Sequence, residues 1–412
     1  MNKSYLVTIS HKFTLVIFYI SLFTSLSLSA NNNLNIYLDA DRSGAKASGL
    51  SIEQGIRTAL SEVNNTIGGK KVNLVIRDHH GNAARSLMHL QEFIQDKNAL
   101  VVFSGLHSTP LLENLNLINN NQILLLDPWA AAGPITRGKS KENWVFRLSI
   151  DDTKAGSVIV NSALKEGFKK PYLLLESTGW GKSNVKTMTK ALKKQALVPH
   201  GIEWFKWNIS LTAAKIKLRQ IVNSGADAIL LVANANEGKT FAKAMLTIKP
   251  EQRLPVRSHW GITGGNFTEV ITAKDRAQID LKFLQTRFSF ISSPATKLSK
   301  QALQQASKLF PQLIKSAKDI KAPTGFIHGY DLTRILIAAS SKGLTGNTKQ
   351  MRLQIKQQLE NLPTKVNGLI KTYHKPFSPY NINNLNAHEA LSSKDFVMAY
   401  YDDKDQIRLV NH

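Results

Sequence analysis

The sequence predicts an α/β protein built from two doubly wound, parallel-sheet lobes. Short, continuously apolar runs alternate with amphipathic segments from residue 34 onward, a pattern typical of parallel strands covered by helices on both faces. The same pattern starts again at residue 171, which indicates a second sheet of the same type. A chain of 412 residues is long enough for two lobes of roughly 100–200 residues each.

The first lobe opens with a short strand at Asn35–Asp39. A helix over 51–64 follows, because its apolar side chains recur at spacings of three to four. The further elements are a strand at 72–78, a helix at 83–96 and two buried strands at 100–103 and 123–126. A turn follows each of the last two strands. In a parallel sheet both turns lie at the same edge, which is the edge where open α/β sheets bind ligands.

The second lobe repeats this order of elements. They are a strand at 171–176, helices at 182–195 and 212–223, a strand at 226–233, a helix at 236–248 and a strand at 254–260. We expect the chain to cross between the lobes first at Asn143–Ser149 and to return at 281–290. The remaining elements are helices near 296–309, 325–341 and 347–361 on the first lobe, and a terminal hairpin of 396–401 with 406–410.

These crossings set the expected domain boundaries. Residues 31–147 with about 288–370 form lobe 1, and residues 148–287 with about 371–412 form lobe 2. No short-period repeat is apparent in the sequence. The two halves are similar in their order of elements but not obviously in their amino-acid sequences.

Residues 1–30 are expected to be a cleavable signal peptide. Lys3, His11 and Lys12 precede an apolar run that ends at the small residue Ala30. The alternative is a single membrane anchor, but the run is short for a span of about 20 residues and contains several Thr and Ser. We therefore predict export of the mature protein to the periplasm.

The chain contains no cysteine. The sequence therefore offers no disulfide, no thiolate metal ligand and no cysteine nucleophile. It also offers no cysteine that could carry a lipid at the mature N-terminus. An exported bacterial protein of this kind is expected to be a soluble periplasmic protein.

The formal net charge of +24 raises the question of nucleic-acid binding. The basic residues are scattered, and short clusters such as Lys169-Lys170 and Lys193-Lys194 lie among apolar positions, as on solvated helix faces. No basic stripe with interleaved aromatic residues is present in the sequence. We therefore expect no nucleic-acid partner, and an anionic membrane surface or an acidic partner suits the charge better.

Two turns of the first lobe carry candidate ligand-binding residues. They lie at 105–110 and 127–133, and their side chains of interest are Ser108, Thr109, Asp127 and Trp129. Hydroxyls, exposed backbone N–H groups and an aromatic wall suit a small polar molecule. Alternatives remain open at each position. The hydroxyls can serve as helix N-caps, the tryptophan can close a loop as a core aromatic, and the aspartate can pair with an ammonium group or satisfy its own turn.

Matching turns follow the strands of the second lobe, at 177–184, 234–238 and 258–266. They carry Trp180, Asn234 and Trp260. An indole wall packs well on an aliphatic or cationic ligand, and helix N-terminal N–H groups can receive an anion. Glu176, at a strand end, is expected to be structural.

The sequence does not match the common motifs for catalysis or cofactor binding. The GWGKSN segment lacks the first glycine of a phosphate-binding loop, since position 176 is Glu. His79 and His80 lack a third metal ligand at useful spacing, and neither GxSxG nor HExxH occurs. We therefore predict no catalytic residues, no metal and no cofactor.

Seven segments in order along the chain carry a family resemblance, namely SGLHSTP, ILLLDPWAAAGPIT, VFRLS, STGWGKSN, ADAILLVAN, SHWGITGG and GYDLTRIL. The chain resembles the type I periplasmic binding proteins of branched-chain amino acid (Leu/Ile/Val) ABC transporters, over essentially all of residues 31–412. The resemblance implies two lobes joined by a three-stranded hinge that close around a small ligand. It also implies a monomeric, non-catalytic receptor that delivers its ligand to an ABC permease. The alternative partner is a membrane sensor, either a histidine kinase or a chemoreceptor.

The resemblance assigns an amino acid's carboxylate and ammonium to the first-lobe turns. By resemblance the ligand-binding residues are Ser108, Thr109, Asp127, Trp129, Ala130, Trp180, Asn234 and Trp260. Two positions depart from the family pattern, since Ala131 replaces a usual threonine and Trp260 stands where an ammonium-binding acid often occurs. Asp127 or Glu237 are candidates to replace that acid. An amide, a small organic acid or a cationic metabolite is the alternative ligand.

Overall fold

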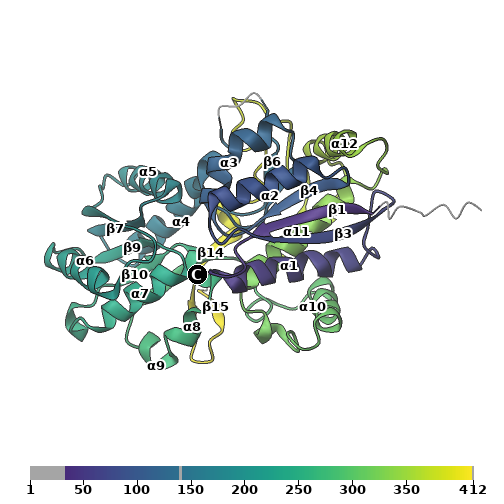
Figure 1. Cartoon of the computed structure of the whole chain (residues 1–412). Helices are drawn as coiled ribbons and strands as arrows, with labels where there is room; N and C mark the ends of the chain where they lie inside the picture. The colour runs from purple at the N-terminus through teal and green to yellow at the C-terminus, as the bar shows by residue number, and fades with distance from the viewer. Residues whose placement is uncertain (1–32, 139–141, 411–412) are drawn as a thin grey trace, which may run out of the picture. The chain divides into compact units, whose positions relative to one another are not determined.

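The computed structural model describes residues 33–138 and 142–410 (Figure 1). The predicted signal peptide at residues 1–30 lies outside the described residues. Within them, one sheet has the strand order β2-β3-β1-β4-β5-β6 and the other β15-β14-β11-β10-β9-β7-β8. Both sheets are mainly parallel, so the predicted α/β class with two lobes is confirmed.

The first sheet forms from buried apolar runs, and β4 is buried at every residue. In chain order the elements are β1 (Leu34–Ala40), α1 (Lys46–Ser61), β2 (Thr66–Ile67), β3 (Lys70–Asp78), α2 (Ala83–Gln95), β4 (Ala99–Ser104), α3 (Ser108–Asn120), β5 (Leu125–Asp127), the 3-10 helix η1 (Gly133–Ile135) and β6 (Val145–Arg147). Strand β1 pairs in parallel with both β3 and β4. Figure 1 shows α1 and α2 on opposite faces of this sheet, as expected for a doubly wound fold.

The second sheet follows the same rules up to β11. Its elements are α4 (Asp152–Lys165), β7 (Pro171–Glu176), α5 (Gly179–Lys193), β8 (Gly201–Phe205), α6 (Leu211–Asn223), β9 (Ala228–Val232), α7 (Ala235–Leu246), η2 (Pro250–Gln252), β10 (Val256–Ser258), η3 (Trp260–Gly264), α8 (Phe267–Val270), α9 (Ala273–Arg276) and β11 (Leu281–Thr286). The final strands β14 (Phe396–Tyr401) and β15 (Ile407–Leu409) pair antiparallel, which confirms the predicted hairpin. Since β14 also pairs antiparallel with β11, this sheet is not wholly parallel.

The return segment carries three longer helices. They are α10 (Lys297–Leu309), α11 (Pro323–Ala339) and α12 (Thr348–Glu360), close to their predicted ranges; η4 (Ala317–Asp319), β12 (Val366–Asn367), β13 (Thr372–Tyr373) and η5 (Ser393–Asp395) complete the chain. Helix α11 is buried along almost its whole length. The lobe boundaries proposed above remain predictions. None of the helices in the described ranges is long and apolar enough to cross a bilayer.

Among the α-helices and strands of five or more residues, α4 and β8 were not predicted from the sequence, and each has a physical reason. Helix α4 buries small residues such as Ala155, Gly156 and Ala163, which give a weak apolar period. Strand β8 lies at the edge of its sheet and buries only Phe205, so it lacks a continuous apolar run.

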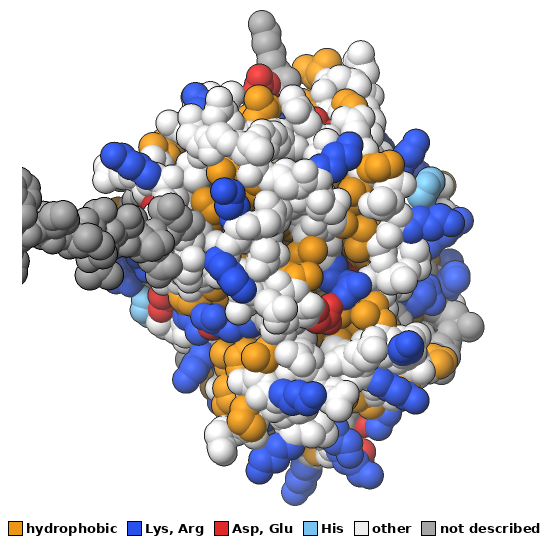
Figure 2. Space-filling model, turned by 90° about the vertical axis from the view of Figure 1, so that its right-hand side faces the viewer, with side chains coloured by type: hydrophobic (Ala, Val, Ile, Leu, Met, Phe, Trp, Pro, Cys, Tyr) orange, Lys and Arg blue, Asp and Glu red, His pale blue; other side chains and the backbone are white. Residues whose placement is uncertain are grey.

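Figure 2 shows one face of the molecule, on which Lys and Arg lie interspersed with polar and apolar side chains. On this face the basic side chains are spread out and do not gather in one stripe, as the sequence suggested.

Candidate functional site

The turns that follow β4 and β5 contact the second lobe directly. The backbone N–H of Gly133 donates to Ser183 Oγ in α5 at 3.1 Å. The backbone N–H of Asp152 donates to the Ala131 carbonyl at 2.9 Å. The predicted turns of both lobes therefore meet at one crevice, and this conformation holds the crevice closed.

Ser108 joins the two first-lobe turns. Its Oγ accepts a hydrogen bond from the backbone N–H of Ala132 at 3.2 Å, and the side chain is buried. The N-cap position of α3 belongs to His107, whose side chain makes no capping bond, so Ser108 is not the cap. Thr109 follows in the first turn of the helix and is half-buried.

Asp127 satisfies its own turn with one oxygen. Its Oδ1 accepts from Ser104 Oγ at 3.0 Å and from the backbone N–H groups of Trp129 and Ala130 at 3.1 and 2.8 Å. Burial raises the pKa of this carboxyl to about 7, against the opposing charge of Arg147. Asp127 Oδ2 has no hydrogen-bond partner in the part of the chain that the structure describes.

The three predicted tryptophans gather in the closed crevice. The Trp129 and Trp260 rings lie edge to face with their centroids 6.3 Å apart, and both are at most 1% exposed. Trp180 packs edge to face on His259, with 4.9 Å between centroids. It lies inside α5 and not in the preceding turn, because Thr178 caps that helix earlier than predicted. In this conformation the indoles pack on protein groups.

A buried polar cluster around Asp152 was missed by the sequence analysis. Asp152 Oδ1 accepts from Trp180 Nε1 at 3.1 Å and from Asn184 Nδ2 at 2.8 Å, and His259 Nε2 lies 3.4 Å away. All four side chains are buried. Asn184 on the buried face of a helix was the available signal, but its partner Asp152 begins the unpredicted helix α4.

Asn234 occupies the N-cap position of α7 and contacts a buried acid. Its Nδ2 donates to Glu176 Oε2 at 2.9 Å, while Thr178 Oγ1 donates to Glu176 Oε1 at 2.7 Å. Burial raises the pKa of Glu176 to about 8. Asn234 also lines a cavity of about 230 Å³ between the lobes, together with residues of the β1–α1 loop. Of the eight predicted ligand-binding residues, Asn234 is the one that lines this cavity.

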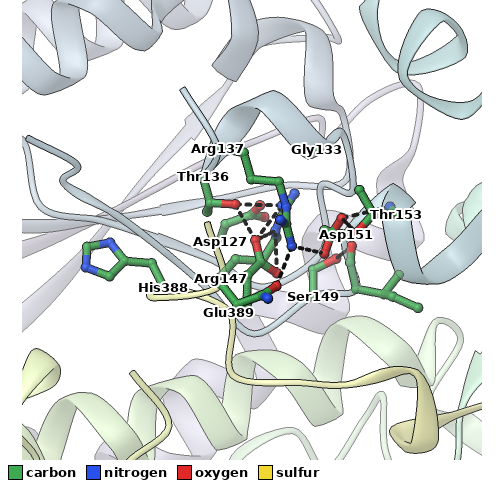
Figure 3. A network of polar contacts seen from close by, with 12 residues as sticks. Asp127, Gly133, Thr136, Arg137, Arg147, Ser149, Asp151, Thr153, His388 and Glu389 are labelled. Carbon is green, nitrogen blue, oxygen red and sulfur yellow. Dashed lines mark hydrogen bonds and ion pairs between the residues drawn. The ribbon is translucent and has the colours of Figure 1, made fainter. Parts of the chain in front are cut away.

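The crossing segments are held by a network centred on Arg147, a fully buried side chain (Figure 3). Its guanidinium donates to Glu389 Oε1 at 3.0 and 2.6 Å and to Thr136 Oγ1 at 2.7 Å. It also donates to the Ala132 carbonyl at 2.8 Å. The network therefore links β6, the segment of Glu389 and the alanine turn at one wall of the crevice.

Asp151 extends this network toward α4. Arg137 donates to its Oδ2 at 2.8 Å, and the backbone N–H of Thr153 donates to its Oδ1 at 2.7 Å. Burial opposes its charge, but Arg147, Arg137 and Lys154 outweigh burial and lower the pKa of Asp151 to about 2. The first crossing is thus fixed by charged hydrogen bonds on both sides of Arg147.

A family model described as periplasmic binding protein matches residues 37–375. A comparison with curated proteins finds no match. Among solved structures, a type 1 periplasmic binding protein from Bordetella pertussis Tohama I has a TM-score of 0.75 at 16% identity, covering 92% of this chain and 99% of that chain.

Two further structures share the fold at similar distance. A solute-binding protein of an ABC transporter from R. palustris, in complex with benzoate, has a TM-score of 0.71 at 14% identity and covers 92% of this chain and 95% of its own. A leucine-binding protein from Thermotoga maritima has a TM-score of 0.70 at 14% identity, with 92% and 98% covered. At these sequence identities the similarity shows a shared fold.

Proposed function

This chain belongs to the periplasmic binding protein family, and on that premise we propose that it captures a small polar solute between its lobes and delivers it to an ABC permease. The observation that carries the proposal is the cavity of about 230 Å³ between the lobes, which is lined by polar turns from both. A few hydrogen bonds would suffice to recognise a ligand enclosed there. Polar groups of the cavity or of a wrong ligand that found no partner would be buried without a hydrogen bond, which is costly.

We propose binding without turnover, driven by a hinge movement about the Arg147 network. In the open form, the first-lobe turns that carry Ser108, Thr109, Asp127, Trp129 and Ala130 would be accessible to the solute, whereas in the closed form the cavity lined by Asn234 would hold it. Closure would then bring Trp180, Asn234 and Trp260 over it. Breaking the contact between Gly133 and Ser183 is the step that would separate the lobes.

For the ligand, we propose an amino acid or a related amide or organic acid. The structural neighbours give a range that includes this class, since one is described as leucine-binding and others were solved with benzoate and 4-hydroxybenzoate. The aromatic residues of the crevice suit an apolar moiety next to a polar group.

The test is a binding screen on residues 31–412 by calorimetry and thermal shift. The panel contains leucine, small amides, benzoate and small amines. Saturable binding of one chemical class is expected, and a ligand at 100 times its Kd stabilises by about 2.7 kcal/mol, or roughly a few degrees. Asn234→Ala should weaken binding, whereas the exposed control Asn223→Ala should leave it unchanged. A folded protein that binds nothing in the panel would contradict solute capture.

Delivery to a permease needs a separate measurement. Uptake of the identified solute is compared between cells with and without this protein. Loss of uptake supports delivery. Unchanged uptake, with binding intact, would overturn delivery and favour a membrane sensor as the partner.

A further inference from the structure

The cavity between the lobes is acidic in a strongly basic protein. The chain has 53 Lys and Arg against 29 Asp and Glu, yet the residues that line this cavity include Asp41 and Glu237 and no Lys or Arg. One carboxylate comes from each lobe, since Asp41 lies in the loop after β1 and Glu237 lies in α7. The local charge therefore opposes that of the whole molecule.

Asp41 is preorganised as an anion. Its Oδ1 accepts from the backbone N–H groups of Ser43 and Gly44 at 3.1 and 2.7 Å, and its Oδ2 lies 3.0 Å from His107 Nε2. Burial opposes the charge, but these hydrogen bonds outweigh it and lower the pKa of the carboxyl below its usual range. The carboxylate is therefore held in a fixed position at the wall of the cavity, with His107 as its side-chain partner.

Glu237 supplies the second carboxylate. It is 4% exposed, and its Oε1 accepts from the backbone N–H of Asn208 at 2.9 Å. No Lys or Arg in residues 33–138 and 142–410 forms an ion pair with it. Lys239, two residues further along α7, donates instead to Asn266 Oδ1 at 2.5 Å. Lys239 acts on Glu237 through its charge but forms no ion pair with it, so an ammonium group in direct contact would stabilise this buried carboxylate further.

His107 and Trp207 complete the lining with groups suited to the same ligand. His107 is 9% exposed, and with Nε2 engaged by Asp41 its Nδ1 has no hydrogen-bond partner within the described part of the chain. The Trp207 ring packs on His107 with 5.3 Å between centroids, so the two lobes contribute adjoining aromatic walls. The indole interacts favourably with an ammonium group, and His107 Nδ1 can accept from it when the imidazole is neutral.

We propose that this cavity binds a small organic cation through its ammonium group, held between Asp41 of one lobe and Glu237 of the other. The inference rests on the proposed receptor function and favours, in place of an organic acid, the cationic metabolite that the sequence left open as an alternative ligand. An anion would face two carboxylates and no Lys or Arg from the lining, and a neutral solute would bring no charge opposite to theirs. The cation would also bridge the lobes, so it would favour the closed form over the open one.

The test is calorimetry on residues 31–412 with choline, putrescine and ethanolamine, and with 3,3-dimethylbutanol as the neutral analogue of choline. At least one cation should bind saturably, and the neutral analogue should not. Glu237→Gln should weaken that binding roughly tenfold or more, because it removes one member of a buried charge pair. Glu251→Gln, which removes the same charge at an exposed position, should have no effect.

Asp41→Asn is a second variant, checked for folding by circular dichroism because Asp41 also holds its own loop. Equal cation binding in Glu237→Gln and Glu251→Gln would overturn the assigned site. If a neutral or anionic solute binds and no cation does, the inference is wrong while the receptor function stands. If no solute of any class binds to the folded protein, both are wrong.

Discussion

At the scale of single residues, Glu176 shows how burial in the crevice changes the pKa of a carboxyl group. This carboxyl ends β7 and is fully buried, and its hydrogen-bond donors, Thr178 and Asn234, are neutral. Burial therefore dominates and raises its pKa to about 8, further supported by the nearby charge of Glu237. The native state thus holds a proton that the unfolded chain releases near its ordinary pKa of 4.5.

This proton makes stability depend on pH. Between the unfolded and folded pKa values the native state binds more protons, so the stabilisation is complete below the unfolded pKa and is lost as pH rises through about 8. His79 and His328 carry no proton in the native state above pH 6.5, since burial lowers the pKa of each to about 4. The free energy of unfolding should then fall by about 1.4 kcal/mol per pH unit for each proton.

The measurement is urea denaturation of the ligand-free protein between about pH 6.5 and 8.5. Glu176→Gln should flatten the slope, leaving the contribution of Asp127, whose pKa burial raises to about 7. The exposed control Glu251→Gln should keep the full slope. Identical slopes in all three proteins would show that Glu176 titrates normally.

At the scale of elements, the packing of α1 on α11 depends on glycine. A Cβ at Gly55 would lie 2.2 Å from the carbonyl oxygen of Phe326, and one at Gly329 would lie 2.8 Å from that of Ile52. The two helices therefore approach with their backbones nearly in contact. This close approach helps to bury α11 on almost every side.

Gly55→Ala should destabilise the protein despite alanine's better helix propensity. Alanine gains about 1 kcal/mol as a helix former, but the clash with backbone atoms costs typically about 1–3 kcal/mol and cannot be relieved by a side-chain rotation. A lower melting temperature is expected. The control is Lys46→Ala, at an exposed position of the same helix. A melting temperature at or above that of the wild type would mean that the two helices can move apart without loss of stability.

At the scale of the whole molecule, the lobes meet through small residues as well as through the tryptophans. A Cβ at Gly179 of α5 would lie 2.6 Å from Leu112 Cδ1 of α3. The natural chain has no cysteine, so a pair of cysteines at these two positions would be its only thiols. A disulfide between them would hold the crevice closed.

We expect the oxidised variant Leu112→Cys with Gly179→Cys to be less accessible to acrylamide than its reduced form. Opening of the lobes exposes the buried indoles of Trp129, Trp180 and Trp260, so blocking it should lower fluorescence quenching. A reducing agent should restore the quenching, and Leu112→Cys alone should not respond to oxidation. Equal quenching before and after a verified disulfide would contradict a hinge that opens at this crevice.

The sequence by itself determined the elements whose signal is local. Continuous apolar runs predicted β4 and β7, helical spacing predicted α1 and α6, and the order of turns predicted which segments meet at the crevice. It also determined the absence of thiols and the excess of basic residues. These are properties of short windows or of composition, where burial imposes a recognisable pattern on neighbouring residues.

Only the tertiary structure decided which side chains face one another. The pairing of Arg147 with Glu389 joins residues 242 positions apart, and the acidic cavity combines Asp41 with Glu237 from different lobes. It also decided that Trp129 and Trp260 pack together in the closed crevice and that Asp152 gathers Trp180 and Asn184. Such contacts leave no periodic trace in the sequence, because they depend on how the two sheets pack against each other.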